Sequence, residues 1–267
     1  MEILIEEFKE GYWTAALDKG RLEGVDVDPP EEAVRWGSIY QGIVRRINKS
    51  DNSAIIEISP DTYGYLSAGD VVQFDENRQP QKISGAIGEA LPVGNTVIVQ
   101  AKEGTLDKKS TSESAQTRQK YPRLSMDVSL QGRFMIYTPY HIENRVSQRV
   151  RQKKLRQQLL AMLDDMTGCQ GCILRAAAVS TQTDMLKSEC THLQNRWDRI
   201  EDKVRKIEGP VILSEGPDAI ARILCDMAQG PIESISIVTM DHLQAVQDWC
   251  ELFAPDLVTK IKPVEIP

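Results

Sequence analysis

The chain has 267 residues, of which 41% are hydrophobic and 27% charged, a balance typical of one large globular domain or two to three small ones. Glycine and proline are too infrequent for a collagen-like or low-complexity chain, and no apolar run approaches the roughly 20 residues of a membrane-spanning helix. The acidic N-terminus has no secretory signal, so the five cysteines indicate cytosolic thiols and a cytoplasmic protein.

The first 28 residues contain three short β-rich runs. They cover residues 1–8, 12–18 and 22–27, with Gly11 and Gly20 in the turns between them. Two prolines and two glutamates follow as a linker. The first 36 residues carry ten acidic and four basic side chains, so the chain begins with a strongly acidic unit.

Residues 37–100 are predicted to form a small barrel or sandwich, because short strands recur there at a spacing of roughly ten residues. Such barrels bind single-stranded nucleic acid by stacking bases on exposed aromatic rings and holding the backbone with lysine and arginine. An equally supported alternative is that one tyrosine is core and the charges only confer solubility. The candidate contacts are Tyr40, Tyr63, Tyr65, Arg45, Arg46 and Lys49.

A basic stretch follows: residues 118–160 carry ten basic and two acidic side chains. Residues 124–137 are predicted to be a strand pair around Gly132, and residues 144–166 a helix. In that helix Arg145, Arg149 and Arg156 would lie near one face. Because the rest of the protein is acidic, contact with phosphates is favoured over a merely solvated face.

The remaining residues alternate between strands and helices. Residues 172–179 are predicted to be a buried strand, and residues 184–207 a helix with a continuous apolar stripe. Strands at 210–216, 233–239 and 257–265 alternate with helices at 217–229 and 241–253. This order predicts a parallel sheet with right-handed crossovers.

Metal and nucleophile motifs are weak. Cys169 and Cys172 form a CxxC pair, but Cys190 and His192 are too closely spaced for a usual zinc site, and Cys190 lies on the apolar stripe. A glycine turn flanked by two thiols is therefore favoured. Asp75 opens a D-x-N sequence in a polar loop and is read as a solvated turn. No nucleophile motif accompanies the three histidines.

Several segments, in order along nearly the whole chain, resemble the N-terminal half of the ribonuclease E/G family. GSIYQGIVRRINKS is similar to a strand with the pattern N-I-Y-x-G-x-[IV], and TYGYL to H-G-F-L. LSMDVSLQGRFMIY resembles T-x-x-[IV]-S-L-x-G-[RS]-[YF]-L-V, and ILRAAAV resembles I-[IV]-R-T-A. NTVIVQ and VTKIKPVEIP are similar to the strand that closes the barrel and to the segment before the family's catalytic portion.

The resemblance implies an α+β fold. A split RNase H-like α/β unit, residues 1–34 and 209–267, would enclose an OB-fold β-barrel at residues 35–120 and an α/β 5′-sensor domain at residues 121–208. Tyr65 matches an aromatic residue that stacks on RNA, and Lys120 matches a basic contact. Gly132, Ile136 and Arg175 match the pocket for the RNA 5′ phosphate. Ala176 replaces the pocket's threonine, and Ile55 replaces a second stacking aromatic.

The implied function is that of a single-stranded RNA-binding protein in RNA processing or decay, without a membrane partner. The family's magnesium-binding D-x-N and second aspartate lie beyond the matched segment, as does its dimerising region. This chain is therefore expected to hold no cofactor, to lack the catalytic metal site and to be a monomer. The alternatives are the N-terminal part of a magnesium-dependent endoribonuclease, or a scaffold whose basic helix binds an acidic protein.

Overall fold

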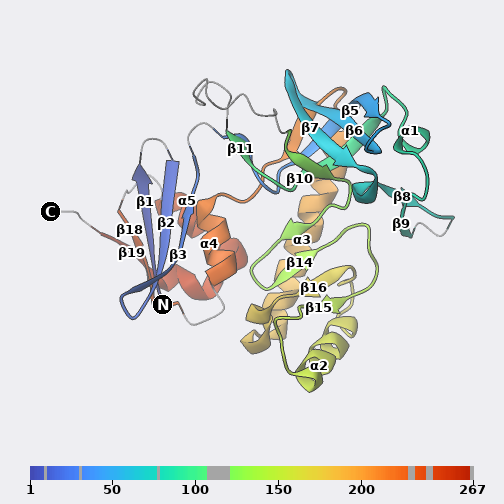
Figure 1. Ribbon diagram of the computed structural model, residues 1–267. Helices are drawn as coiled ribbons and strands as arrows, with labels where there is room; N and C mark the ends of the chain where they lie inside the picture. Colours follow the sequence, from blue (N-terminus) through green and yellow to red (C-terminus); the bar gives the residue numbers. More distant parts are fainter. Residues whose placement is uncertain are drawn as a thin grey trace.

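Segments from both ends of the sequence meet in one sheet (Figure 1). In this computed structural model, which describes residues 1–8, 11–29, 32–76, 79–106, 121–227, 232–238 and 243–264, the strand order is β19-β18-β1-β2-β3. Strand β1 pairs in parallel with β18, so that Ile3 lies opposite Ile235. The strands of this chain-end sheet are β1 (Glu2–Phe8), β2 (Gly11–Asp18), β3 (Arg21–Val27), β18 (Ser234–Ile237) and β19 (Ile261–Pro263).

Alternation along these strands places Ile3, Ile5 and Ile235 on one face, where they are almost completely buried. Helices α4 (Ala219–Met227) and α5 (Leu243–Phe253) cover that face with apolar side chains. The parallel pairing of β18 with β19 across α5 confirms the end of the predicted strand-helix alternation.

The predicted barrel is present and closed, but one of its strands, at Arg123–Ser125, lies beyond the predicted residues 35–120. Strands β5 (Ile39–Asn48), β6 (Ser53–Ser59), β7 (Thr62–Ser67), β12 (Arg123–Ser125) and β10 (Thr96–Ala101) pair in sequence, and β10 returns to β5. Gly64 allows this closure, because a Cβ atom there would lie 2.4 Å from Leu124 Cδ1. Short elements precede, connect or follow the barrel strands along the chain. They are β4 (Glu32–Val34), β8 (Val72–Phe74), β9 (Pro80–Lys82), β11 (Thr105–Leu106), α1 (Ile87–Ala90) and a 3-10 turn at Ala68–Asp70.

A third group of elements, here called the α3 unit, lies below the barrel in Figure 1. Its long helix α3 (Thr183–Val204) confirms the predicted apolar stripe, since Leu186, Leu193 and Trp197 are buried. The other elements are β13 (Leu130–Gln131), β14 (Met135–Tyr137), β15 (Arg145–Val146), β16 (Cys172–Leu174), α2 (Lys153–Asp164) and a 3-10 helix at Ala176–Ser180.

The predicted helix over residues 144–166 is wrong in its first third, because α2 begins only at Lys153. The side chain of Asn144 donates to the Cys169 carbonyl over 2.9 Å and accepts from the Cys172 amide over 3.0 Å. Strand β15 then pairs with β16. These contacts hold the segment extended, so Arg145 and Arg149 are not on the helix.

Three predicted strands also differ. The strand expected at 257–265 is shorter, because a 3-10 helix at Pro255–Lys260 precedes β19. The other two lie in the α3 unit and against the barrel. The strand expected over residues 172–179 ends at Leu174 and continues as the 3-10 helix. The strand expected at 210–216 is β17 (Val211–Ser214), which pairs antiparallel with β5 of the barrel and is not part of the parallel sheet. Both segments are apolar, and their composition does not specify which partner strand they meet.

Buried apolar side chains of the described residues form three clusters: beneath the chain-end sheet, inside the barrel and around α3. In Figure 1, helix α3 runs from beneath the barrel down into the α3 unit. None of the helices in the described ranges is both long and apolar enough to cross a membrane.

Candidate functional site

A cavity of about 250 Å³ lies where strands β14 and β16 meet helix α4. It brings Ile136 and Arg175, which match the family's 5′-phosphate pocket, together with Arg149 of the basic stretch. Gly132 adjoins it, because its carbonyl accepts a hydrogen bond of 2.9 Å from Arg175 Nη1. The side chains that line this Arg175 cavity are Ile136, Ser147, Arg149, Ile173, Arg175, Ala176, Ala177, Cys225 and Asp226.

Arg175 is held in place at the point where β16 ends. Its amide donates to the Phe134 carbonyl over 2.7 Å, and its Nη2 donates to Asp226 Oδ1 on α4. The side chain is 15% exposed. A guanidinium oriented in this way beside a cavity can grip a phosphate through two parallel N–H groups. Ala176 lines the same cavity and provides no hydroxyl.

The turn between β13 and β14 is fixed from behind by Glu189 of α3, which the sequence analysis missed. The Glu189 carboxylate accepts hydrogen bonds from three consecutive amides, those of Arg133, Phe134 and Met135. It is 2% exposed, and burial raises its pKa to about 7 against the opposing effect of those amides. A Cβ atom at Gly132 would lie 2.7 Å from this carboxyl group.

A second ion pair ties the same turn to the C-terminal part of the chain. Arg133 Nη1 donates to Asp256 Oδ1 over 2.6 Å, and Nη2 donates to Oδ2 over 3.3 Å. The Arg133 side chain is only 7% exposed. Arg133 is therefore a structural member of the basic stretch and is not available to a nucleic acid.

Three tyrosines gather beside strand β7. Gly64 and Leu66 face the barrel interior, so alternation places Tyr63 and Tyr65 on the outer face, where both are half-buried. Tyr121, which precedes β12, packs edge-on against Tyr63 with ring centroids 6.2 Å apart. Tyr65 lies opposite Ile55 and beside Arg123. These three rings form an aromatic surface, here called the tyrosine face.

Other predicted barrel contacts have mixed outcomes. Tyr40 is 5% exposed and belongs to the barrel core, so the prediction that it contacts RNA is wrong. Tyr40 points into the barrel with Val44, and the opposite face of β5 is also buried, because Ile39 packs in the cluster around α3. Arg45 is exposed and forms an ion pair with Glu57, and Arg46 is exposed. Lys120 lies outside the described residues.

The basic stretch places several cations on the protein surface, and one of them, Arg149, lines the Arg175 cavity. Within the described ranges, none of the following side chains forms an ion pair with another described residue. The set is Arg145, Arg149, Arg151, Lys153, Lys154 and Arg156, of which only Arg156 is half-buried.

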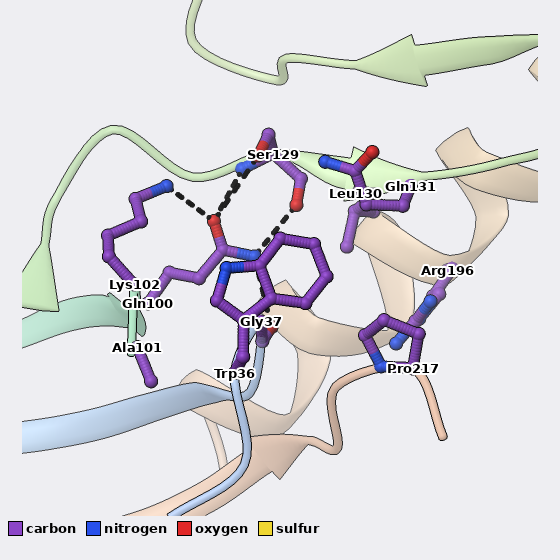
Figure 2. Close-up of a pocket in the computed structure, with 10 residues that line it drawn as sticks. All are labelled: Trp36, Gly37, Gln100, Ala101, Lys102, Ser129, Leu130, Gln131, Arg196 and Pro217. Atoms are coloured by element: carbon purple, nitrogen blue, oxygen red, sulfur yellow. Dashed lines mark hydrogen bonds between the residues drawn. The ribbon is translucent and has the colours of Figure 1, made fainter. Parts of the chain in front are cut away.

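A buried glutamine joins the barrel to the α3 unit. Figure 2 shows Gln100 of β10 donating to the carbonyls of Gly37 and Ser129, at 3.0 and 2.8 Å. Its Oε1 accepts from the Ser129 amide and from Lys102 Nζ. Burial lowers the pKa of Lys102. The network fixes the position of β13, and so of the Gly132 turn, relative to the barrel.

The CxxC segment is a glycine turn, as predicted. Gly171 has a φ of +68°, and a Cβ atom there would lie 2.3 Å from the His141 carbonyl oxygen. The Sγ atoms of Cys172 and Cys190 are 3.8 Å apart in the core, and burial raises the pKa of Cys169 to about 12.

Asp75 accepts from the Gln79 amide over 2.7 Å within its turn, and Asn77 of the D-x-N sequence lies outside the described residues. Across the described ranges no group of three or more histidine, cysteine, aspartate or glutamate side chains is arranged to hold a metal ion.

The comparisons with known proteins agree with the resemblance. Ribonuclease G of Haemophilus influenzae is 26% identical over 98% of this chain, and that of Escherichia coli K12 is 22% identical over 98%. Ribonuclease E of a Synechocystis species is 27% identical over 79% of the chain. The chain spans about half the length of the Ribonuclease G relatives, 52% in each case. The sequence model of the ribonuclease E/G family matches residues 129–266, more than half of the chain, and the chain therefore belongs to this family.

Proposed function

We propose that this chain binds single-stranded RNA and acts in RNA processing or decay. The observation that carries the proposal is the tyrosine face, on which Tyr63, Tyr65 and Tyr121 gather at the outer surface of a closed barrel. Rings on such a surface stack on bases of any sequence, and nearby arginines hold the backbone. The relatives named ribonuclease support RNA as the ligand.

The proposal includes a second contact, in which the Arg175 cavity receives the phosphate at the 5′ end of the RNA. Arg175 would grip the phosphate, and exposed Arg149, which also lines the cavity, would add positive charge. Gly132 and Ile136 would contribute backbone groups. Because Ala176 supplies no hydroxyl, we expect the preference for a monophosphate over a hydroxyl end to be modest.

The same proposal assigns the parts of the chain. Residues 35–120 together with strand β12 would be an OB-fold RNA-binding domain, and the remainder of residues 121–208 a 5′-sensor domain. Residues 1–34 and 209–267 would form one RNase H-like unit, an assignment supported by the parallel pairing of β1 with β18. Because one chain builds both RNA contacts, we propose that it binds RNA as a monomer. The buried free thiols support a cytoplasmic location.

Tyr65→Ala is expected to weaken binding of a single-stranded RNA oligomer by about 1–3 kcal/mol, whatever group the 5′ end carries, because a base loses its stacking partner. Fluorescence anisotropy with 5′-hydroxyl and 5′-monophosphate oligomers measures the effect. Tyr65→Phe keeps the ring and should bind like the wild type. Unchanged affinity in Tyr65→Ala would remove the tyrosine face from the RNA path, and no RNA binding by the wild type would favour the protein scaffold.

Arg175→Ala is expected to abolish any preference for a 5′ monophosphate while 5′-hydroxyl RNA binds nearly as before, because only the terminal phosphate would use this guanidinium. The ratio of the two affinities is the measurement. Arg175 also holds the Gly132 carbonyl and Asp226, so thermal melting is recorded alongside. A lower melting temperature with equal weakening of both RNAs would show that the role of Arg175 is structural.

A further inference from the structure

The Arg175–Asp226 ion pair spans two separate parts of the chain at the edge of the Arg175 cavity. Arg175 comes from the end of β16, and Asp226 from α4, which packs on the chain-end sheet. Both residues line the cavity. The Arg175 side chain is 15% exposed, whereas that of Asp226 is 61% exposed. The aspartate therefore presents its carboxylate to the arginine from the solvent side.

The donors of Arg175 are already partly used. Nη1 donates to the Gly132 carbonyl, and Nη2 donates to Asp226 Oδ1. A phosphate that approached Arg175 through the cavity would meet the negative charge of Asp226 before it could make a two-point contact with the guanidinium. A terminal phosphate carries a charge of about −1.5 to −2 near pH 7. The phosphate and the Asp226 carboxylate would therefore repel each other if both lay beside Arg175.

We propose that Asp226 competes with the RNA 5′ phosphate for Arg175, so that the ion pair to α4 and a bound phosphate exclude each other. This inference rests on the proposed 5′-phosphate function of the same cavity. A monophosphate end displaces the carboxylate, which turns outward into solvent. A hydroxyl end carries no charge and leaves the ion pair intact.

The second ion pair makes such an exchange possible without separating the two parts of the chain. Arg133 and Asp256 connect the same turn to the segment after α5. Arg133 does not line the cavity, and its side chain is 7% exposed. Loss of the Arg175–Asp226 contact would thus free α4 locally, while the turn stays docked through Arg133.

The test compares Asp226→Asn with the wild type, using 5′-monophosphate and 5′-hydroxyl forms of one single-stranded RNA oligomer. We expect Asp226→Asn to bind the monophosphate form about three- to tenfold more tightly and the hydroxyl form within twofold of the wild type. Asp226→Ala, which also removes the hydrogen-bond acceptor, should give the same shift in the ratio of the affinities for the monophosphate and hydroxyl forms. Asp226→Glu retains the charge and should keep the wild-type ratio.

Asp256→Asn is the matched control, because it breaks the other arginine–aspartate contact between the same parts and should leave the ratio unchanged. An unchanged or lower ratio in both Asp226→Asn and Asp226→Ala would overturn the competition. NMR titration of the whole chain with adenosine 5′-monophosphate and with adenosine repeats the comparison of charged and uncharged ends. These probes are too small to bind the cavity and the tyrosine face at once. A shifted ratio with these small probes and no binding of 5′-hydroxyl RNA would support the competition while rejecting the tyrosine face.

Discussion

Replacing Glu189 by alanine is expected to lower the free energy of unfolding by about 3–5 kcal/mol at pH 6, because three neighbouring amides lose their acceptor in a buried turn. Chemical denaturation measures the change. Asp202→Ala, at an exposed position on the same helix, is the control and should change stability by about 0.5 kcal/mol or less. A loss of under 1 kcal/mol in Glu189→Ala would show that water replaces the carboxylate at these amides.

Glu189 also predicts a pH dependence with a definite sign. The folded protein keeps this proton up to a pKa of about 7, whereas the unfolded chain releases it near 4.5. The contribution of this raised pKa to the free energy of unfolding is therefore complete below about pH 4.5 and is lost as the pH rises to about 7. Relative to Glu189→Gln, the wild type should lose about 3 kcal/mol across this range. A stability difference that does not change with pH would contradict the raised pKa.

Affinity for single-stranded RNA is expected to fall about 100-fold between 50 and 200 mM salt, if about four to six phosphates are neutralised. The logarithm of the association constant should fall against the logarithm of salt concentration with a slope of about −3 to −4. This large effect is predicted for a protein of net charge −7, because residues 145–156 carry six basic and no acidic side chains.

Two double variants locate the source of that slope. Lys153→Gln with Lys154→Gln should reduce its magnitude by about 1.4, because each of the two lost phosphate contacts contributes about 0.7. Lys187→Gln with Lys206→Gln changes the net charge equally at exposed positions outside the basic stretch, and it should leave the slope unchanged. A flat titration of the wild type would reject electrostatic binding and favour the scaffold.

Local patterns predicted the barrel and helix α3 well, because each depends on apolar residues that recur at the spacing of its own element. They failed where a distant partner decides the structure. Asn144 leaves the predicted helix because its side chain bonds to the Cys169 and Cys172 backbone. Tyr40 shares a face of β5 with Val44 and points into the barrel core, which alternation along the strand alone does not distinguish from an outward-facing position.

The candidate site shows the same division. Family-like motifs pointed to Gly132, Ile136 and Arg175, which the structure brings around one cavity. Asp226 lies about fifty residues further along, and no local pattern connects it to Arg175. Glu189 did leave a signal: it lies three residues after Leu186 and four before Leu193, on the apolar stripe of α3. A carboxylate at such a position needs buried donors.

The parallel pairing of β1 with β18 has a consequence for synthesis on the ribosome. Strands β1, β2 and β3 are made first. The strand that pairs with β1 on its other side, β18, is completed more than two hundred residues later. The barrel, whose strands β5, β6, β7, β10 and β12 lie between Ile39 and Ser125, is complete long before that. Domains generally fold as units as they emerge, so nascent chains would carry a folded barrel while the first hairpins still expose Ile3 and Ile5. These early strands are then the part of the nascent protein most in need of protection by chaperones.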